Sequence, residues 1–372
     1  MKTVKIVLIN LAVLFVFIEG ASFLYFKLGL SISSYQPSYM TDAHDTESQW
    51  MTEYNNWGAW HKLNGRANKE RRCFGVDLIA NSYGARDVER QKQGTENRVV
   101  VLGDSFVEGY GVDVQNRFSE GLEEKLGVEF LNFGASGDFG PAQYAILYRD
   151  LVSQFNHDKV LIAILPDNDF TDNDPEYWQD ADKDSFQLRY RPYWKKTVSG
   201  EGYEVFYPTQ KPQEIVTFAS YRNQATSGRT WGSRIQRLLW SHGVYREIRY
   251  ISRRATLEAG TYSGYFDANQ EQIESAKFFI KKIQTLATGK EVSFFTIPRL
   301  SDLERLKNEK SDMVTQFTKF AADNDLGYID LAPKMSASVD DVFKLFLPCD
   351  GHWSPLGHKV AADILLEEFY SN

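Results

Sequence analysis

An apolar run that ends in Gly-Asp-Ser is the feature that most constrains how this chain folds. Residues 99–102 read Val-Val-Val-Leu and are followed at once by Gly103, Asp104 and Ser105. A short β-branched run bounded by turn residues is typical of a parallel strand buried on both faces. Open α/β sheets bind their ligands at the carboxyl ends of such strands. The pattern therefore presents Ser105 to a substrate, although an Asp-Ser pair is also an ordinary turn and helix cap.

Strands and helices alternate along most of the chain after residue 96. Strands are expected at residues 98–102, 128–133, 159–165, 292–298 and 327–331, and helices at residues 116–126, 141–155, 269–287, 311–324 and 355–369. Five strands joined by helices predict a flavodoxin-like three-layer α/β/α sandwich with a five-stranded parallel sheet. The alternation fails over residues 171–268. We interpret these residues as an insertion, at the carboxyl edge of the third strand, within a catalytic domain that spans residues 96–372.

The amino terminus carries an apolar segment long enough to cross a membrane. Residues 6–26 hold a single charge, Glu19, and are preceded by Lys2 and Lys5. This length spans a hydrocarbon layer of ~30 Å, and the leading lysines favour an amino end in the cytoplasm. A cleaved signal peptide, with residues 20–22 as the cleavage region, is the alternative. Both interpretations place the catalytic domain outside the cytoplasmic membrane, either anchored by a single pass or secreted.

Composition excludes several classes of function. A net charge of −8 and the lack of a basic stripe argue against nucleic acid as a partner. The two cysteines, Cys73 and Cys349, form no zinc motif but can pair in an oxidising compartment. No Gly-x-Gly-x-x-Gly loop occurs, so the sequence implies neither a metal nor an organic cofactor. Residues 28–95 are polar and irregular, and we interpret them as a stalk and entry segment.

A serine nucleophile needs a base, and the histidines differ in where they fall. His352 lies in the loop between the last strand and the last helix, at the carboxyl edge of the predicted sheet. His157 precedes a strand and so falls at the opposite edge, whereas His358 falls in the first turns of the last helix. Asp350 is close enough to His352 to hold the imidazole in one tautomer, as in a Ser-His-Asp site. The alternative is that Asp350 is only a turn residue.

Four short blocks, taken in order, resemble the signature of the SGNH/GDSL hydrolase superfamily. They are residues 103–105 (Gly-Asp-Ser), 132–138 (Asn-Phe-Gly-Ala-Ser-Gly-Asp), 166–169 (Pro-Asp-Asn-Asp) and 350–352 (Asp-Gly-His). The resemblance implies an acyl-serine enzyme with Ser105 as the nucleophile and His352 as the base. It also implies an oxyanion hole formed by the Ser105 N–H, the Gly137 N–H and the side-chain amide of Asn168.

The last block departs from the hydrolase pattern. The family usually has Asp three residues before His, whereas Gly351 alone separates Asp350 from His352 here. An Asp-x-His-Trp pattern is similar to that of exported proteins of the alginate O-acetyltransferase type, which move acyl groups onto polysaccharides. The departure leaves open whether Asp350 or another carboxylate orients His352.

Three functions follow from these residues and this resemblance. The first is a serine acyl-esterase acting on O-acyl groups, such as O-acetyl, of an envelope or extracellular polysaccharide. The second is an O-acyltransferase to a polysaccharide, and the third is an inactive glycan-binding protein. The expected partners are an acylated carbohydrate or another ester, together with the membrane. Aromatic residues of the insertion are either sugar platforms or a small local core: Trp178, Tyr190, Tyr193 and Trp194.

Overall fold

A five-stranded parallel sheet forms the centre of the protein, seen in a computed structural model. The structure describes residues 2–30, 51–71, 73–94, 96–137, 139–181, 190–208, 210, 238–254, 262–348 and 350–371. The sheet has the order β11-β10-β7-β5-β6. Its strands are β5 (Val99–Gly103), β6 (Phe130–Gly134), β7 (Lys159–Ile164), β10 (Glu291–Thr296) and β11 (Gly327–Asp330). This is the flavodoxin order, and it confirms the predicted fold class.

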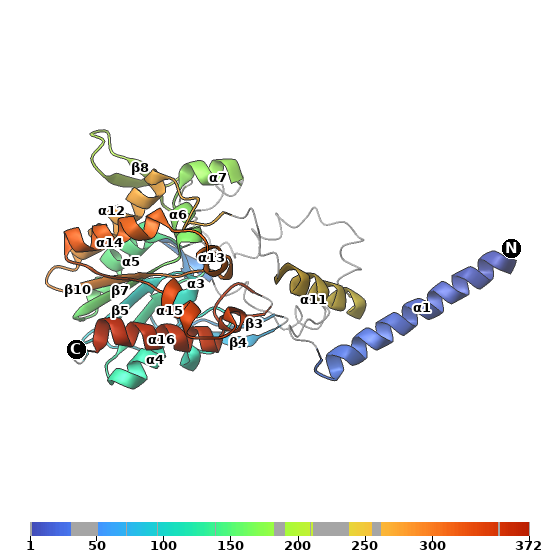
Figure 1. Ribbon diagram of the computed structural model, residues 1–372. Coiled ribbons are helices and arrows are strands. Elements are labelled where there is room, and N and C mark those ends of the chain that lie inside the picture. Colours follow the sequence, from blue (N-terminus) through green and yellow to red (C-terminus); the bar gives the residue numbers. More distant parts are fainter. Residues whose placement is uncertain are drawn as a thin grey trace.

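Helices cover both faces of the sheet and complete the three layers (Figure 1). One face carries α5 (Pro141–Asp150), α12 (Gln270–Leu286) and α14 (Asp312–Asn324), and the other carries α4 (Phe118–Leu126), α13 (Leu300–Arg305), α15 (Ala332–Ala337) and α16 (Pro355–Tyr370). Along β5, Val100 and Leu102 pack into the first core, whereas Val99 and Val101 pack into the second. Because side chains alternate along a strand, an apolar run of this kind fills two cores at once.

Several predicted boundaries are wrong by a few residues, because turns at the ends of elements are not visible in an apolar pattern. The helix predicted from residue 116 begins at Phe118, since Val114–Asn116 form a 3-10 turn and Arg117 takes the cap position. The helix predicted to end at residue 155 ends at Asp150, and a second 3-10 turn follows it.

The segment predicted to be irregular contains two antiparallel hairpins, so that prediction is wrong for residues 51–79. Strand β1 (Met51–Asn55) pairs with β2 (Gly58–His61), and β3 (Arg66–Glu70) pairs with β4 (Gly75–Ile79). Within the predicted stalk and entry segment, residues 31–50 lie outside the described residues. Cys73 is disulfide-bonded, whereas Cys349, its predicted partner, lies outside the described residues.

The described part of the insertion consists of short elements. They are α7 (Pro175–Ala181), the hairpin of β8 (Tyr193–Lys196) and β9 (Tyr203–Phe206), and α11 (Trp240–Arg254). Three of the four singled-out aromatic residues are buried: Tyr190, Tyr193 and Trp194. Trp194 packs into the first core of the sheet rather than into a separate core of the insertion. The fourth, Trp178, lines a cavity described below.

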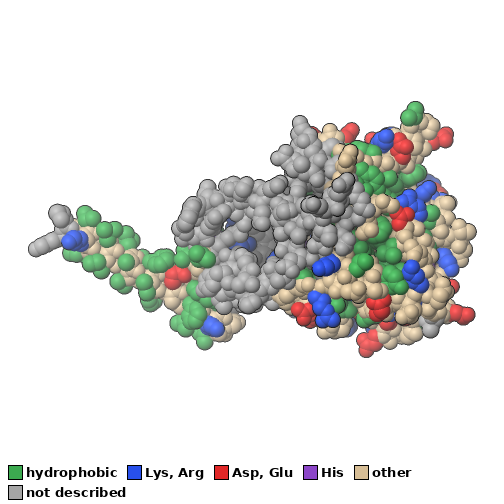
Figure 2. All heavy atoms as spheres, turned by 180° about the vertical axis from the view of Figure 1, so that it is seen from behind, with side chains coloured by type: hydrophobic (Ala, Val, Ile, Leu, Met, Phe, Trp, Pro, Cys, Tyr) green, Lys and Arg blue, Asp and Glu red, His purple; other side chains and the backbone are tan. Residues whose placement is uncertain are grey.

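At the amino terminus, α1 (Lys2–Lys27) is one continuous helix. Residues Thr3–Lys27 are long and apolar enough to cross a membrane, a test that a signal sequence also passes. Most of its apolar side chains are exposed. Figure 2 shows the helix as an arm, largely green, that extends away from the body of the protein.

Candidate active site

Ser105 is the first residue of the short helix α3 (Ser105–Glu108), directly after strand β5. The Asp104 carboxylate caps this helix by accepting a hydrogen bond of 2.9 Å from the Phe106 N–H. The helix lies so close to strand β6 that a Cβ added to Gly134 would be 2.2 Å from the Glu108 nitrogen. A glycine at this position is therefore required for α3 to hold Ser105 against the carboxyl edge of the sheet.

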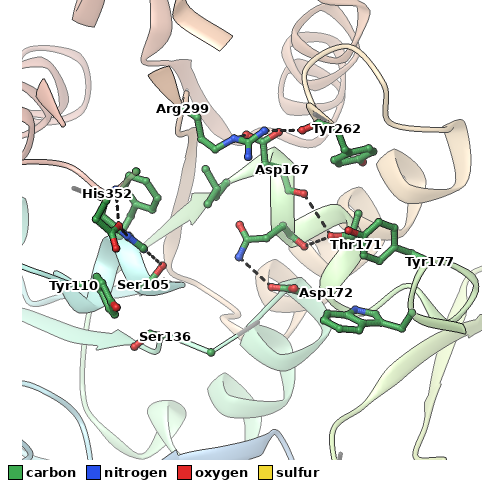
Figure 3. Close-up of a pocket in the computed structure, with 17 residues that line it drawn as sticks. Ser105, Tyr110, Ser136, Asp167, Thr171, Asp172, Tyr177, Tyr262, Arg299 and His352 are labelled. Carbon is green, nitrogen blue, oxygen red and sulfur yellow. Dashed lines mark hydrogen bonds and ion pairs between the residues drawn. The ribbon is translucent and has the colours of Figure 1, made fainter. Parts of the chain in front are cut away.

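Ser105, His352 and Asp350 form a continuous chain of hydrogen bonds (Figure 3). The distance between Ser105 Oγ and His352 Nε2 is 2.7 Å. On the other side of the ring, His352 Nδ1 is hydrogen-bonded to Asp350 Oδ1. That same carboxylate oxygen also accepts a hydrogen bond of 3.2 Å from the His352 backbone N–H. This geometry permits a proton to pass from the serine hydroxyl to an imidazole that is oriented by a carboxylate.

The electrostatics of Asp350 suit such an orienting contact. Burial alone would raise the pKa of this carboxyl, but the hydrogen bonds and charge of His352 outweigh burial and lower the pKa below its ordinary value. Asp350 therefore carries a negative charge at neutral pH and favours a proton on the facing nitrogen of the imidazole.

Two aromatic rings hold the imidazole of His352 in place. Tyr110 stacks on it with a centroid distance of 4.4 Å and an interplanar angle of 28°, and Phe106 lies 4.8 Å away. The ammonium group of Lys69, from strand β3, lies 3.8 Å from the centre of the Tyr110 ring. The entry segment thus supports the site, a contribution that the sequence did not reveal because Lys69 is far from the motif blocks.

The residues of the predicted oxyanion hole line the same cavity as Ser105. The cavity has a volume of about 730 Å³, and its lining includes Gly137, Asn168, Asp350 and His352. Asn168 lies on α6 (Pro166–Asp172), directly after strand β7. Its amide nitrogen donates one hydrogen bond, of 3.1 Å, to Asp172.

The opposite wall of the cavity carries a charged pair that the sequence did not reveal. Arg299, which precedes α13, forms an ion pair with Asp167 and donates a hydrogen bond of 2.6 Å to the Tyr262 carbonyl oxygen. Burial and the nearby Asp302 raise the pKa of Asp167 above its ordinary value, although the positive charge of Arg299 opposes this shift. Three aromatic residues of the insertion complete the wall: Tyr177, Trp178 and Tyr262. Such a wall can contact the flat face of a sugar ring.

The buried side chain of Glu108 connects three segments of the chain: its own helix α3, the loop that carries Ser136, and strand β2. Its carboxylate accepts hydrogen bonds from both the backbone N–H and the hydroxyl of Ser136. His61 Nε2, from strand β2, lies 3.5 Å from the same carboxylate. Burial would raise the pKa of Glu108, but the charges of His61 and Arg86 dominate and hold it well below the ordinary value. Glu108 is therefore a buried anion that fixes the residue immediately before Gly137.

We expect Glu108→Gln to lower both stability and activity. Removing the charge leaves buried donors poorly compensated, which costs about 1–3 kcal/mol of the free energy of unfolding. A shift of the Ser136–Gly137 backbone would lower kcat about 10- to 100-fold, because catalytic donors act only when they are accurately placed. Denaturant unfolding and ester-hydrolysis kinetics check the two effects, with the exposed Glu124→Gln as a matched control. Unchanged kcat in Glu108→Gln would contradict the positioning role.

His358 and His157 do not line the cavity. His358, on α16, is buried against Phe118 with a centroid distance of 6.2 Å, and burial lowers its pKa to about 3. His157 shares a hydrogen bond of 2.9 Å with the Tyr148 hydroxyl, next to the start of strand β7. Among the described residues, no group of three or more His, Cys, Asp or Glu side chains is arranged to hold a metal ion.

Comparison with known proteins finds similarity among solved structures only. No model of a protein family matches the chain, and no curated protein matches it. A member of the lipolytic protein G-D-S-L family from Veillonella parvula matches with 13% identity and a TM-score of 0.38, over 74% of this chain and 99% of that one.

Two further matches have the same degree of similarity. The lipase/acylhydrolase from Enterococcus faecalis matches with 12% identity and a TM-score of 0.36, over 73% of this chain and 94% of that one. A carbohydrate esterase family 2 enzyme with a carbohydrate binding domain, from Corynascus thermopiles, matches with 12% identity and a TM-score of 0.37, over 74% of this chain and 67% of that one. At these identities and TM-scores the matches support no conclusion about the chemistry, which is inferred from the site itself.

Proposed function

We propose that the chain is a serine acyl-esterase that hydrolyses ester-linked acyl groups through an acyl-serine intermediate. The observation that carries the proposal is the hydrogen-bonded chain from Ser105 through His352 to Asp350, which opens into the cavity. A nucleophile, a base and an orienting carboxylate in hydrogen-bond contact are the arrangement that acyl transfer requires.

The reaction follows from these groups. Ser105 Oγ attacks the ester carbonyl carbon while His352 Nε2 takes the hydroxyl proton. The N–H groups of Ser105 and Gly137 and the Asn168 amide stabilise the negative charge that develops on the carbonyl oxygen. Each such donor contributes roughly 2.7–4 kcal/mol to the transition state. The ester C–O bond then breaks, and the alcohol leaves with the proton from His352. Water, deprotonated by His352, attacks the acyl-serine and releases the carboxylic acid.

The proposed substrate is an O-acylated carbohydrate at the cell envelope or outside the cell. Tyr177, Trp178 and Tyr262 give the cavity an aromatic wall suited to a sugar ring. The polar side of the same cavity is formed by Asp167 and Arg299, which can bind hydroxyl groups. The apolar helix α1 would anchor the enzyme, with its catalytic domain on the outer side of the cytoplasmic membrane.

An O-acyltransferase is the second candidate. Residues 350–353 read Asp-Gly-His-Trp, which resembles the Asp-x-His-Trp pattern of proteins of the alginate O-acetyltransferase type. Trp353 is fully buried and packs against Phe106 with a centroid distance of 5.1 Å, so it fixes the loop that carries His352. In this reaction a sugar hydroxyl, rather than water, attacks the acyl-serine. The chemistry of Ser105, His352 and Asp350 is otherwise the same.

Turnover of p-nitrophenyl acetate, with and without oligosaccharide acceptors, tests both candidates. An esterase releases p-nitrophenol in saturable fashion without an acceptor and forms acetate. A transferase requires the acceptor and places the acetyl group on it, which mass spectrometry of the oligosaccharide detects. No turnover under either condition would contradict both candidates and would favour a binding protein.

A further inference from the structure

Glu19, the single charged residue within the apolar stretch 6–26 of α1, caps the first turn of α11 in the insertion. Glu19 accepts a hydrogen bond of 2.8 Å from the Trp240 N–H and one of 3.1 Å from the Ser241 N–H, and it also accepts one from the Ser241 hydroxyl. A carboxylate at the edge of the hydrocarbon layer is costly unless it is paired. The amino terminus of a helix offers N–H donors and a partial positive charge. Helix α11 therefore supplies the compensation that Glu19 needs.

Aromatic residues extend this contact toward the end of α1. The ring of Trp240 lies 5.2 Å from that of Phe23 and 5.6 Å from that of Phe26. The Tyr25 hydroxyl donates a hydrogen bond of 3.0 Å to Glu247, further along α11. Tryptophan and tyrosine concentrate where a membrane meets water. With the amino end of α1 in the cytoplasm, this cluster marks the outer surface of the membrane.

The face of α11 that is turned away from Glu247 is apolar and basic rather than purely polar. Glu247 is buried, whereas Tyr245 and Ile248 are 56% and 60% exposed. Arg249 is also exposed, directly next to Ile248. The sequence of α11 holds four arginines and a single glutamate, in a chain whose net charge is −8. A helix with exposed apolar and basic residues is typical of segments that lie in the plane of a membrane surface.

We propose that α11 lies on the outer surface of the membrane beside the anchor, with anionic phospholipid head groups as its partner. The side chains of Tyr245 and Ile248 enter the head-group layer, and Arg249 contacts lipid phosphates. The inference rests on the proposed anchoring by α1, to which α11 is hydrogen-bonded through Glu19 and Tyr25. It gives the catalytic domain a second attachment to the membrane, through its own insertion.

Site-specific fluorescence in the full-length protein tests this placement. Single cysteines are introduced at Ile248 on α11, at Phe17 on α1, and at Val198 in the exposed turn between β8 and β9. Each is labelled with a polarity-sensitive dye and reconstituted into vesicles of phosphatidylcholine and phosphatidylglycerol that contain a lipid-borne quencher. We expect quenching and a shift to shorter wavelength at Ile248 and Phe17, and neither at Val198.

The outcomes separate this inference from the anchoring on which it rests. Quenching at Phe17 with an Ile248 signal like that of Val198 would overturn the placement of α11 and leave the anchor intact. No quenching at either position would overturn the anchor and the placement together.

The charge of the lipid provides an independent check. One arginine near an anionic surface changes membrane partitioning about fivefold. Quenching at Ile248 should therefore weaken in vesicles of phosphatidylcholine alone and in the Arg249→Gln variant, but persist in Arg249→Lys. Equal quenching in all of these would contradict the assignment of anionic head groups as the partner. Ester hydrolysis by each labelled protein confirms that it is folded.

Discussion

Replacing Ser105 with alanine is expected to lower ester hydrolysis about 10⁴- to 10⁶-fold and to leave the fold intact. The side chain supplies the oxygen that bonds to the acyl group, so its removal eliminates the covalent route. Ser105 is the first residue of α3, and the cap on this helix comes from Asp104, so the backbone does not depend on the hydroxyl. Steady-state hydrolysis of p-nitrophenyl acetate measures the loss, and circular dichroism with thermal unfolding measures the fold.

Ser153→Ala is a suitable control for this variant. Ser153 is exposed, and its hydroxyl donates a hydrogen bond of 3.0 Å to the Arg149 carbonyl oxygen on the surface. The control should hydrolyse the ester at the rate of the unmodified protein. A Ser105→Ala protein that is folded and retains that rate would show that another group is the nucleophile.

Replacing Asp350 with asparagine is expected to lower kcat about 10⁴-fold, the loss that follows when an imidazole is held in the wrong tautomer. Asparagine fits the same space but can present an N–H group to His352 Nδ1 instead of a negative oxygen. Because the folded-state pKa of Asp350 is below its ordinary value, the carboxylate of the unmodified protein is charged at every pH between about 5 and 8. The loss should therefore be present throughout this range, in a pH series of kcat for the two proteins.

Asp340→Asn serves as a matched control, because Asp340 is exposed and lies outside the cavity lining. Its kcat should equal that of the unmodified protein. Near-normal kcat in Asp350→Asn would mean that another carboxylate orients His352.

The lowered pKa of Asp350 also predicts how acid affects the contact with His352. A carboxyl with a lowered pKa stabilises the folded state above its unfolded pKa, and that stabilisation is lost as the pH falls through the folded value. The Asp350–His352 contact should thus weaken only under strongly acidic conditions.

The sheet and the position of Ser105 could be predicted because both depend on local patterns. A strand buried on two faces must be apolar along its whole length, as residues 99–102 are, and this pattern is visible without any partner. The loops after successive parallel strands meet at one edge, so Asn168 and His352 could be assigned to the same site as Ser105 from their places in the order of elements.

Other features depend on contacts between distant parts of the chain. Glu108 lies three residues after Ser105, but its partner His61 comes from a hairpin that the sequence did not reveal. The strands of that segment are short and only partly apolar, so they resemble a loop. The pair of Asp167 and Arg299 joins residues from two different loops, and no spacing rule connects them.

Labelling with a fluorophosphonate tests the central claim most directly, because this reagent forms a stable bond only with an activated nucleophile. After digestion, mass spectrometry of the labelled protein should find the adduct on the peptide that contains Ser105. The adduct should be absent from Ser105→Ala and should form far more slowly in Asp350→Asn. An adduct on a different residue would contradict the account. So would an unmodified protein that hydrolyses the ester but forms no adduct with the fluorophosphonate.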